Sequence, residues 1–196
     1  MSPEDPFRIA LVTIFSLMTV IMGYHRLQAA KSGDRITRKD EGILLAVSLR
    51  LAGLCLWVAT LTYLIAPASL EWSQWPLPDG LRWLGAGVGG LFIVLIYWTL
   101  TNLGKNLTDT VMTRAQATLV TNGPYRHVRH PFYVSVGLLI FAVALLTANW
   151  FIGLAGLLVM ALLVVRTPKE EQKLIEKFGD EYRAYMARTG RFLPRW

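Results

Sequence analysis

The apolar residues of this chain are gathered into five runs, and this grouping limits its fold more than any other feature. A helix needs about 20 predominantly apolar residues to cross the roughly 30 Å hydrocarbon core of a bilayer. Three runs approach or reach that length, while two shorter runs hold fifteen residues each and are joined by only three residues. The predicted spans are residues 7–24, 43–66, 81–103, 133–147 and 151–165. We therefore expect an all-α integral membrane protein with five transmembrane helices, the last two forming a short antiparallel helical hairpin.

The whole chain is predicted to form a single membrane-embedded domain, because no repeat, low-complexity tract or soluble segment interrupts the pattern. Residues 1–103 supply three spans in this interpretation. Residues 104–196 supply a polar loop, the helical hairpin and the helices of a cytoplasmic cap.

Basic residues are distributed unequally between the loops, and this asymmetry predicts the orientation. They gather in the first loop, the third loop and the C-terminal tail, whereas the leader and the second loop hold almost none beyond Arg8 and Arg82. The basic residues of the two loops include Lys31, Arg35, Arg38, Lys39, Lys105, Arg114, Arg126 and Arg129. Because positively charged loops stay on the cytoplasmic side, we expect the N-terminus outside and the C-terminus in the cytoplasm, at the inner membrane if the host is a bacterium.

The formal net charge of +7 follows mainly from this topology. Anionic lipid headgroups attract basic residues at the cytoplasmic surface, so the charge does not call for a nucleic-acid partner. With a single cysteine, Cys55, the sequence also offers no cysteine-based metal site, and no metal is expected.

The third loop ends in a segment that combines rigid turns with hydrogen-bonding side chains, directly against the fourth apolar run. Residues 122–124 are an Asn-Gly-Pro turn signal. Tyr125, His127, His130 and Tyr133 follow within nine positions. A loop that only joined two helices would not need this density of polar rings, so the segment is predicted to hold something polar at the edge of the bilayer.

Pro131 suits the first position of the helix that follows, because its missing N–H is not needed there. The unpaired N–H groups and the positive dipole end at such a helix start attract a carboxylate or a phosphate. Two plainer interpretations stay open at this point. His130 is then only a polar residue at the start of a helix, and Tyr133 only an aromatic residue of the membrane interface.

Residues 117–121, upstream of the turn, form a short stretch rich in β-branched side chains. Its backbone groups can line a pocket. Leu119 and Val120 can equally anchor the loop on the bilayer, and the pattern does not decide between the two.

Three charged residues near the cytoplasmic side are candidates for function, and each also has a plainer structural interpretation. Arg166 ends the fifth run, either as an anchor that reaches the headgroups or as a functional cation. Thr167 and Pro168 predict the start of a new helix, in which Glu170 closes a capping box. Arg50 lies inside the second span but near enough to its end to reach the interface. The tail after Glu170 predicts a pair of amphipathic helices broken at Gly179.

These segments resemble a known family, the isoprenylcysteine carboxyl methyltransferases, together with the broader group of membrane phospholipid methyltransferases. The resemblance covers about residues 103–194. It is carried by residues 119–125, by Arg-His-Pro-Phe-Tyr at 129–133, and by Glu170-Glu171 followed by residues 178–182 and Tyr185. Members of this size are similar five-span proteins with an outward N-terminus. The family binds S-adenosylmethionine in a cytoplasmic cap and methylates a lipophilic substrate that enters from the bilayer.

Carried over by position, the resemblance implies a set of cofactor contacts and one substrate-binding residue, Arg166. The cofactor contacts are Ala117, Thr118, Leu119, Val120, Tyr125, His130, Pro131, Phe132, Tyr133 and Glu170. The chain departs from the family pattern at two positions. Ser135 stands where the eukaryotic motif has Gly, and Ala117 stands where some members have His.

The chemistry of these residues agrees with the implied activity. S-adenosylmethionine carries a sulfonium cation. A carboxylate such as Glu170 and the ring faces of Tyr125 and Tyr133 are suitable partners for this cation. An ionised carboxylate is already a nucleophile, and Arg166 can grip it in two places. An ammonium substrate would instead need a base and would be repelled by the guanidinium. The expected reaction is carboxyl O-methylation of an isoprenylcysteine-like acceptor.

Three alternatives remain at this point. The first is a methyltransferase that acts on a phospholipid amine or a lipophilic thiol, with Arg166 on a lipid phosphate. The second is an enzyme like the membrane sterol reductases, which use a nicotinamide cofactor but are much longer. The third is a membrane scaffold without catalytic activity.

Overall fold

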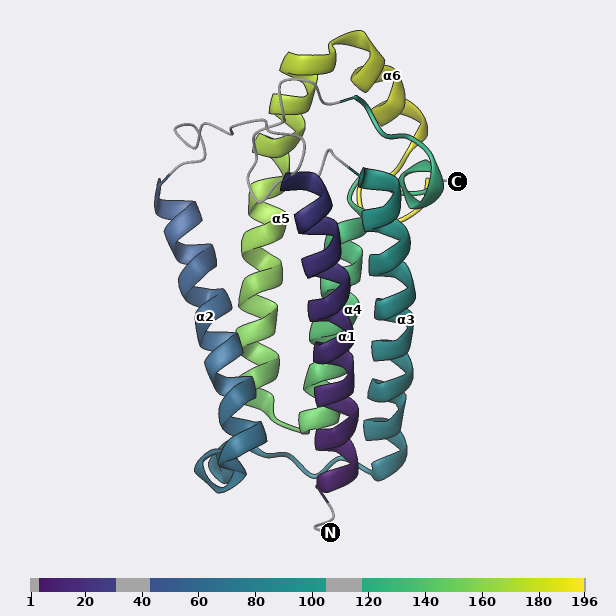
Figure 1. Cartoon of the computed structure of the whole chain (residues 1–196). Helices are drawn as coiled ribbons and strands as arrows, with labels where there is room; N and C mark the ends of the chain where they lie inside the picture. The colour runs from purple at the N-terminus through teal and green to yellow at the C-terminus, as the bar shows by residue number, and fades with distance from the viewer. Residues whose placement is uncertain (1–3, 31–42, 105–117, 196) are drawn as a thin grey trace.

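The computed structural model describes residues 4–30, 43–104 and 118–195, and these form an elongated bundle of helices (Figure 1). The long helices are α1 (Asp5–Ala30), α2 (Ile43–Ile65), α3 (Asp79–Leu103), α4 (Pro131–Thr147) and α5 (Trp150–Phe178). Two short 3-10 helices, η1 (Pro67–Ser73) and η3 (Gly123–Arg126), and the helix α6 (Asp180–Arg188) complete the order. No β-strand occurs among the described residues. We call the end of the bundle that carries α6 the cap end.

The predicted all-helical membrane fold is confirmed. Four helices, α1, α2, α3 and α5, are long and apolar enough to cross a membrane, and α4 is a shorter apolar helix of 17 residues. The observed bounds of α2, α3 and α4 lie within two residues of the predicted spans, because long apolar runs determine them. Helix α1 continues to Ala30, six residues beyond its predicted end.

The fifth helix is longer than predicted, and the predicted helix start at Thr167 is wrong. Helix α5 runs without a break through Pro168 to Phe178. The hydroxyl of Thr167 donates to the carbonyl of Leu163 at 2.9 Å, as it does inside a helix, and Glu170 therefore closes no capping box. Thr167 and Glu171 are both buried one turn apart, so this face of the helix is packed although Pro168 cannot donate a backbone hydrogen bond. The predicted break at Gly179 is confirmed, with φ at 57°.

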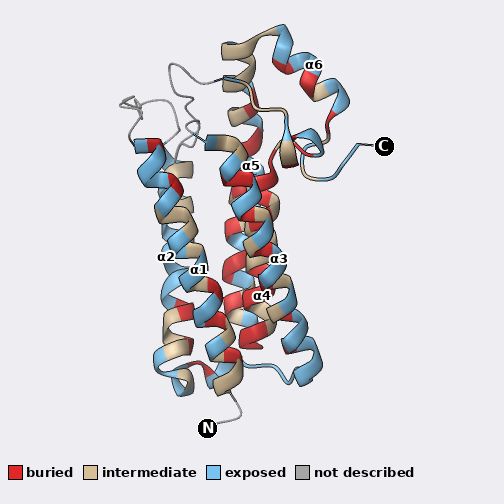
Figure 2. Cartoon of the chain, turned by 45° about the vertical axis from the view of Figure 1, so that its right-hand side comes forward, coloured by how far each residue is buried: buried red, intermediate tan, exposed pale blue. Residues whose placement is uncertain are grey.

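Helix α4 lies among the other helices and contributes eight buried residues (Figure 2). It packs most closely against α3, where a Cβ atom on Gly85 would come within 2.8 Å of the Leu145 Cβ and 3.0 Å of the Ala142 carbonyl oxygen. Small residues allow such close approach of helices in membranes. Because α4 packs against α1, α3 and α5, its short apolar length is covered in part by protein and has less bilayer to match.

A buried arginine ties the helices together at the end opposite the cap. Arg82 of α3 is 6% exposed and makes a two-pronged bond to the carboxylate of Glu4, with both N···O distances 2.6 Å. It also donates to the carbonyl of Leu146 at 2.8 Å, and the Tyr63 hydroxyl donates to Glu4 at 2.8 Å. Residues from the start of α1 and from α2, α3 and α4 thus meet in one polar cluster. This cluster, which we call the Arg82 cluster, consists of Glu4, Tyr63, Arg82 and the carbonyl of Leu146. The sequence indicated only that Arg82 lies at the end of a span.

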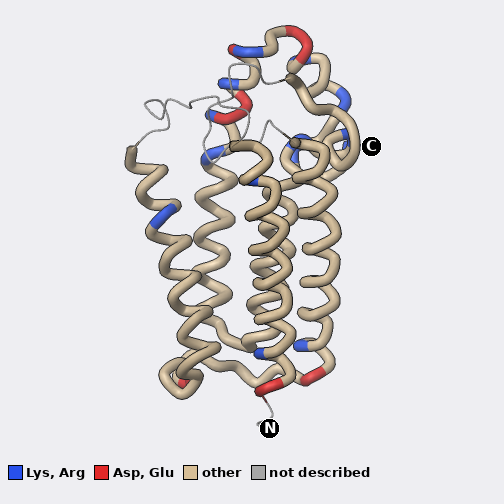
Figure 3. Tube along the Cα trace, in the orientation of Figure 1, with Lys and Arg blue, Asp and Glu red and all other residues tan. Residues whose placement is uncertain are grey.

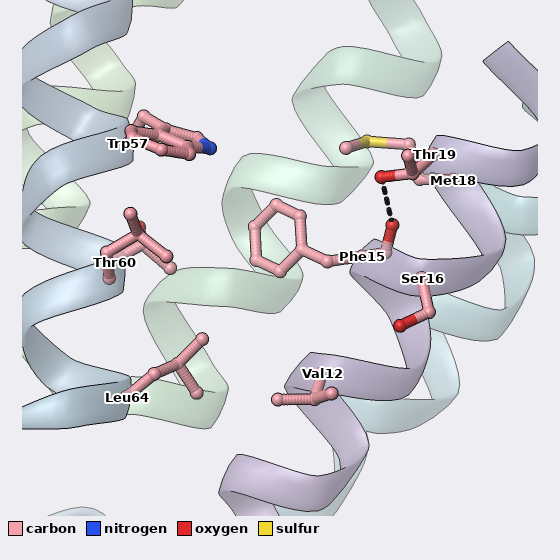
Figure 4. A pocket seen from close by; sticks show the side chains of 9 residues that line it. Val12, Phe15, Ser16, Met18, Thr19, Trp57, Thr60 and Leu64 are labelled. Carbon is pink, nitrogen blue, oxygen red and sulfur yellow. Dashed lines mark hydrogen bonds between the residues drawn. The ribbon is translucent and has the colours of Figure 1, made fainter. Parts of the chain in front are cut away.

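Helices α1 and α2 line a partly open pocket of about 480 Å³ in the half of the bundle away from the cap (Figure 4). Phe15 of α1 points toward α2, where Trp57, Thr60 and Leu64 face it. The hydroxyl of Thr60 donates to the carbonyl of Leu56 in its own helix, so it presents little polarity to the pocket. The walls are therefore mainly apolar.

Candidate functional site

The site is built where the third loop meets the start of α4 and the polar end of α5, at the cap end of the bundle. The turn predicted at residues 122–124 leads into η3. Gly123 has φ at 56° and lies so close to Asn102 that a Cβ atom would come within 2.5 Å of its side chain. This close approach fixes the loop against the end of α3.

Helix η3 places Tyr125 in the interior of the cap. Tyr125 is 9% exposed, and its carbonyl accepts a 2.6 Å hydrogen bond from the hydroxyl of Tyr185 on α6. Burial raises the pKa of Tyr125, and it raises the pKa of Tyr185 to about 12. Both phenols therefore stay protonated at physiological pH, and Tyr185 joins α6 to the loop.

The predicted start of α4 at Pro131 is confirmed, with Pro at the first helical position and His130 before it. The His130 side chain does not cap the helix. Its Nε2 atom lies 3.1 Å from Oε1 of Glu171, and its ring stacks on that of Tyr133, with centroids 5.4 Å apart and planes 13° apart. His130 is thus more than a polar residue at a helix start.

Tyr133 and Glu170, both predicted as cofactor residues, lie in direct contact. The Tyr133 hydroxyl donates to Oε2 of Glu170 at 2.5 Å. Tyr133 is buried and Glu170 is half-buried. The structure therefore brings together three predicted site residues, His130, Tyr133 and Glu170, from the two arms of the hairpin.

Glu171 is the center of the polar contacts in the cap, and the sequence-based prediction missed this. Its side chain is 4% exposed and accepts bonds from Arg129 Nε at 2.9 Å and Arg191 Nη2 at 2.5 Å, besides the contact with His130. The apolar part of α5 ends at Val165, so Glu171 lies outside the membrane-spanning part. Burial alone would raise the pKa of this carboxyl, but the hydrogen bonds from His130, Arg191 and Arg129 outweigh burial and hold its pKa at about 2. Glu171 is therefore ionised at physiological pH.

Residues 189–193, which we call the C-terminal strap, cross the start of α4. The backbone N–H groups of Arg129 and His130 donate to the carbonyls of Gly190 and Arg191, at 2.8 and 3.1 Å. The Arg129 guanidinium also donates to the carbonyl of Thr189. The only sequence signal for the contact between the C-terminal strap and α4 was the family resemblance, which extended to about residue 194.

The other predicted residues have less defined surroundings. Pro131 is buried and Phe132 is half-buried beside Tyr133, with the ring centroids of Phe132 and Tyr133 6.2 Å apart. In the loop, Thr118 is exposed, and Leu119 and Val120 are half-buried. Ala117 lies outside the described residues. Among the residues that the structure describes, no three His, Cys, Asp or Glu side chains gather as metal ligands.

Arg166 lies on α5 four residues before Glu170, so the two side chains project from the same face of the helix one turn apart. It is half-buried. A guanidinium, two carboxylates of different surroundings and a group of stacked rings thus lie at the polar end of one apolar hairpin. Such a set can hold a cationic ligand against Glu170 and an anionic group against Arg166.

Comparison with known proteins identifies relatives of this region. Residues 89–176 match the model of the Isoprenylcysteine carboxyl methyltransferase (ICMT) family. Protein-S-isoprenylcysteine O-methyltransferase of Rattus norvegicus is 32% identical over 134 residues, which are 64% of this chain and 46% of the rat protein. Cobalt-zinc-cadmium resistance protein CzcN of Cupriavidus metallidurans is 30% identical over 122 residues, 58% of this chain and 54% of that protein. The chain spans about half the length of these curated relatives.

A solved structure shares the fold. The eukaryotic intramembrane Ras methyltransferase ICMT superposes with a TM-score of 0.53 at 22% sequence identity, covering 94% of this chain and 67% of that one. At this identity the likeness concerns the fold alone. The matched segment of the family model, residues 89–176, contains every residue predicted for the site. Over residues 89–176 the chain is therefore similar to the isoprenylcysteine carboxyl methyltransferase family.

Proposed function

We propose that the protein is an S-adenosylmethionine-dependent methyltransferase that esterifies the carboxylate of a lipophilic, isoprenylcysteine-like acceptor. The observation that carries the proposal is the contact between Tyr133 and Glu170, with His130 stacked on Tyr133 and Arg166 one turn away on α5. The family match over the same residues supports a methyl-transfer reaction.

The donor is assigned to the side of the site that holds Glu170. A half-buried carboxylate beside the rings of Tyr133 and His130 suits a ligand with a sulfonium and an ammonium group. The remaining proposed contacts are Ala117, Thr118, Leu119, Val120, Tyr125, Pro131 and Phe132. Once bound, S-adenosylmethionine supplies an electrophilic methyl group and departs as a neutral thioether.

The acceptor is assigned to Arg166. A guanidinium can hold a carboxylate with two parallel bonds and so point one oxygen at the donor. Because the carboxylate is already ionised, the residues of the site need not remove a proton. They have to align the two reactants and exclude water, and alignment alone contributes up to about 7–11 kcal/mol to catalysis.

We also propose the orientation in the membrane. Lys and Arg gather around the cap end, and little charge lies along the middle of the bundle (Figure 3). The positive-inside rule then places the cap in the cytoplasm and the N-terminus outside, with α4 as a fifth span held between the longer helices. In a bacterium this is the inner membrane. The acceptor reaches the site sideways from the bilayer.

The decisive experiment uses the full chain in detergent micelles, S-adenosylmethionine with a radiolabelled methyl group, and N-acetyl-S-farnesylcysteine. We expect label in the acceptor that mild alkali releases as volatile methanol, because only a methyl ester is split under these conditions. Phosphatidylethanolamine and a lipophilic thiol serve as parallel acceptors.

Label that is stable to alkali would instead identify an amine or thiol methyltransferase. Oxidation of a reduced nicotinamide nucleotide with a sterol would favour the reductase alternative. Absence of transfer to any acceptor, together with absence of S-adenosylmethionine binding in calorimetry, would contradict the proposal.

A further inference from the structure

The C-terminal strap places an aromatic ring against the candidate donor site, and this residue lies beyond the segment that the family model matches. The ring of Phe192 lies 5.8 Å from the ring of His130 and 6.5 Å from that of Tyr133, measured between centroids. Since His130 and Tyr133 also stack on each other, the three rings form one group beside the carboxylate of Glu170.

The position of Phe192 is fixed from both sides. On one side, it packs against the apolar cluster that contains Tyr133, Val159 and Leu163. On the other side, the strap is held by the backbone bonds of Gly190 and Arg191 to the start of α4.

Two further features restrain the strap around Phe192. A Cβ atom on Gly190 would overlap the carbonyl oxygen of Leu193, so the turn before Phe192 requires glycine. Arg191 adds its 2.5 Å bond to the buried carboxylate of Glu171, a charge-assisted contact that holds the strap down. A ring restrained in this way loses little conformational freedom when a ligand binds beside it.

We propose that Phe192 forms a further wall of the methyl-donor site and faces the sulfonium of S-adenosylmethionine together with Tyr133. This inference rests on the proposed function. Aromatic faces attract cations, and the attraction is strongest where water is excluded. Half-buried Phe192 carries no polar atom, so its contribution to such a site is its ring face and its bulk. A cationic donor and its neutral thioether product have nearly the same shape, so a ring that faces the sulfonium discriminates between them.

The test compares Phe192→Leu with the unaltered protein, by calorimetry in detergent, for two ligands. Leucine keeps apolar bulk but has no ring face. We expect S-adenosylmethionine to bind between about threefold and thirtyfold more weakly, the range that cation–π interactions span. S-adenosylhomocysteine, the neutral product, is expected to bind almost unchanged. Phe192→Trp, which keeps a ring face, is expected to retain the preference for the cation.

The matched control is Phe151→Leu at the far tip of the hairpin, where the ring contacts Trp72 at 5.5 Å. This variant is expected to bind both ligands as the unaltered protein does. The inference is overturned if Phe192→Leu binds both ligands equally more weakly, or binds neither more weakly. If Phe192→Leu does not fold, loss of the preference for the cation in a folded Phe192→Trp overturns it. An unaltered protein that binds neither ligand contradicts the proposed function instead, so the two failures are distinct.

Discussion

Two adjacent carboxylates, Glu170 and Glu171, have opposite surroundings. Glu171 is buried and receives bonds from two guanidinium groups and an imidazole. Glu170 is half-buried and receives a bond from a neutral phenol. Because neighbours on a helix point about 100° apart, one side chain can hold the cap together while the next faces the ligand. In the proposed site, the Glu-Glu pair in the sequence therefore contains one structural residue and one binding residue.

Glu170→Gln tests the binding role. Glutamine can still accept the Tyr133 bond but carries no charge, so we expect S-adenosylmethionine to bind tenfold or more weakly, about 1.4 kcal/mol or above. Calorimetry on purified protein measures this, and Glu176→Gln, an exposed carboxylate on the same helix, is the control. Since α5 is continuous at Thr167, loss of a helix cap no longer offers another explanation. Unchanged affinity would exclude Glu170 from the donor site.

Glu171→Gln tests the structural role. Removing one partner from a buried ion pair leaves an uncompensated charge on Arg129, and the expected loss of stability is about 3–5 kcal/mol. Thermal unfolding in detergent at pH 7 measures it, with exposed Glu181→Gln as the control. A variant as stable as the unaltered protein would show that the cap does not depend on these bonds.

The same pair of proteins gives a pH dependence with a fixed sign. The pKa of Glu171 is lowered to about 2 from an ordinary value of 4.5. Its stabilising contribution is therefore fully present above pH 4.5 and is lost as the pH falls toward 2. We expect the difference in unfolding temperature between the unaltered protein and Glu171→Gln to be constant from pH 7 to 5 and to shrink in more acidic buffers. A difference that already shrinks between pH 7 and pH 5 would contradict this assignment to Glu171.

Arg166→Lys separates an anchor from a substrate-binding residue. Lysine keeps the charge and reaches the headgroups as well as arginine does, but it lacks the planar fork that grips a carboxylate. We expect the variant to fold, to bind S-adenosylmethionine and to transfer methyl groups on the order of a hundredfold more slowly. Arg183→Lys, on the exposed face of α6, is the control. Undiminished transfer in Arg166→Lys would make Arg166 a membrane anchor.

At the scale of elements, the sequence predicted the helices but not where the fifth one ends. The length and hydropathy of the apolar runs are enough to predict the membrane spans, because the bilayer requires apolar helices of a given length. The Thr-Pro-Lys-Glu pattern at residues 167–170 is a local signal for a helix start, and here packing overrides it. The bonds of Glu171 were not predictable in the same way, since two of its partners lie 42 and 41 residues away and the third 20.

Pro168→Ala distinguishes a continuous α5 from a helix that starts anew at Thr167. Within a continuous helix, alanine restores a backbone donor and removes a steric conflict, so we expect a higher unfolding temperature and a gain of up to about 3 kcal/mol. At a true helix start, proline is favourable and the same change would lower stability or leave it unaltered. Thermal unfolding of both proteins decides between these outcomes.

At the scale of the whole molecule, the unequal charge of the two ends predicts how the bundle lies in the membrane. A reporter at the C-terminus is expected to indicate the cytoplasm and one at the N-terminus the outside. Alkaline phosphatase and green fluorescent protein fusions measure this in a bacterial host. Both ends on the same side would contradict the five-span arrangement, because an odd number of spans separates them.

The Arg82 cluster has a consequence for the order in which the protein is made. Glu4 and Arg82 are 78 residues apart, so the acidic end of α1 emerges long before its partner is synthesised. Until α3 enters the bilayer, Glu4 lacks the guanidinium that neutralises it and has only its contact with the Tyr63 hydroxyl of α2 from this cluster. Insertion and final docking are then separate stages, because the two-pronged bond waits for the third span. We expect a nascent chain halted before α3 to form cross-links between α1 and α2 less efficiently than the finished bundle does.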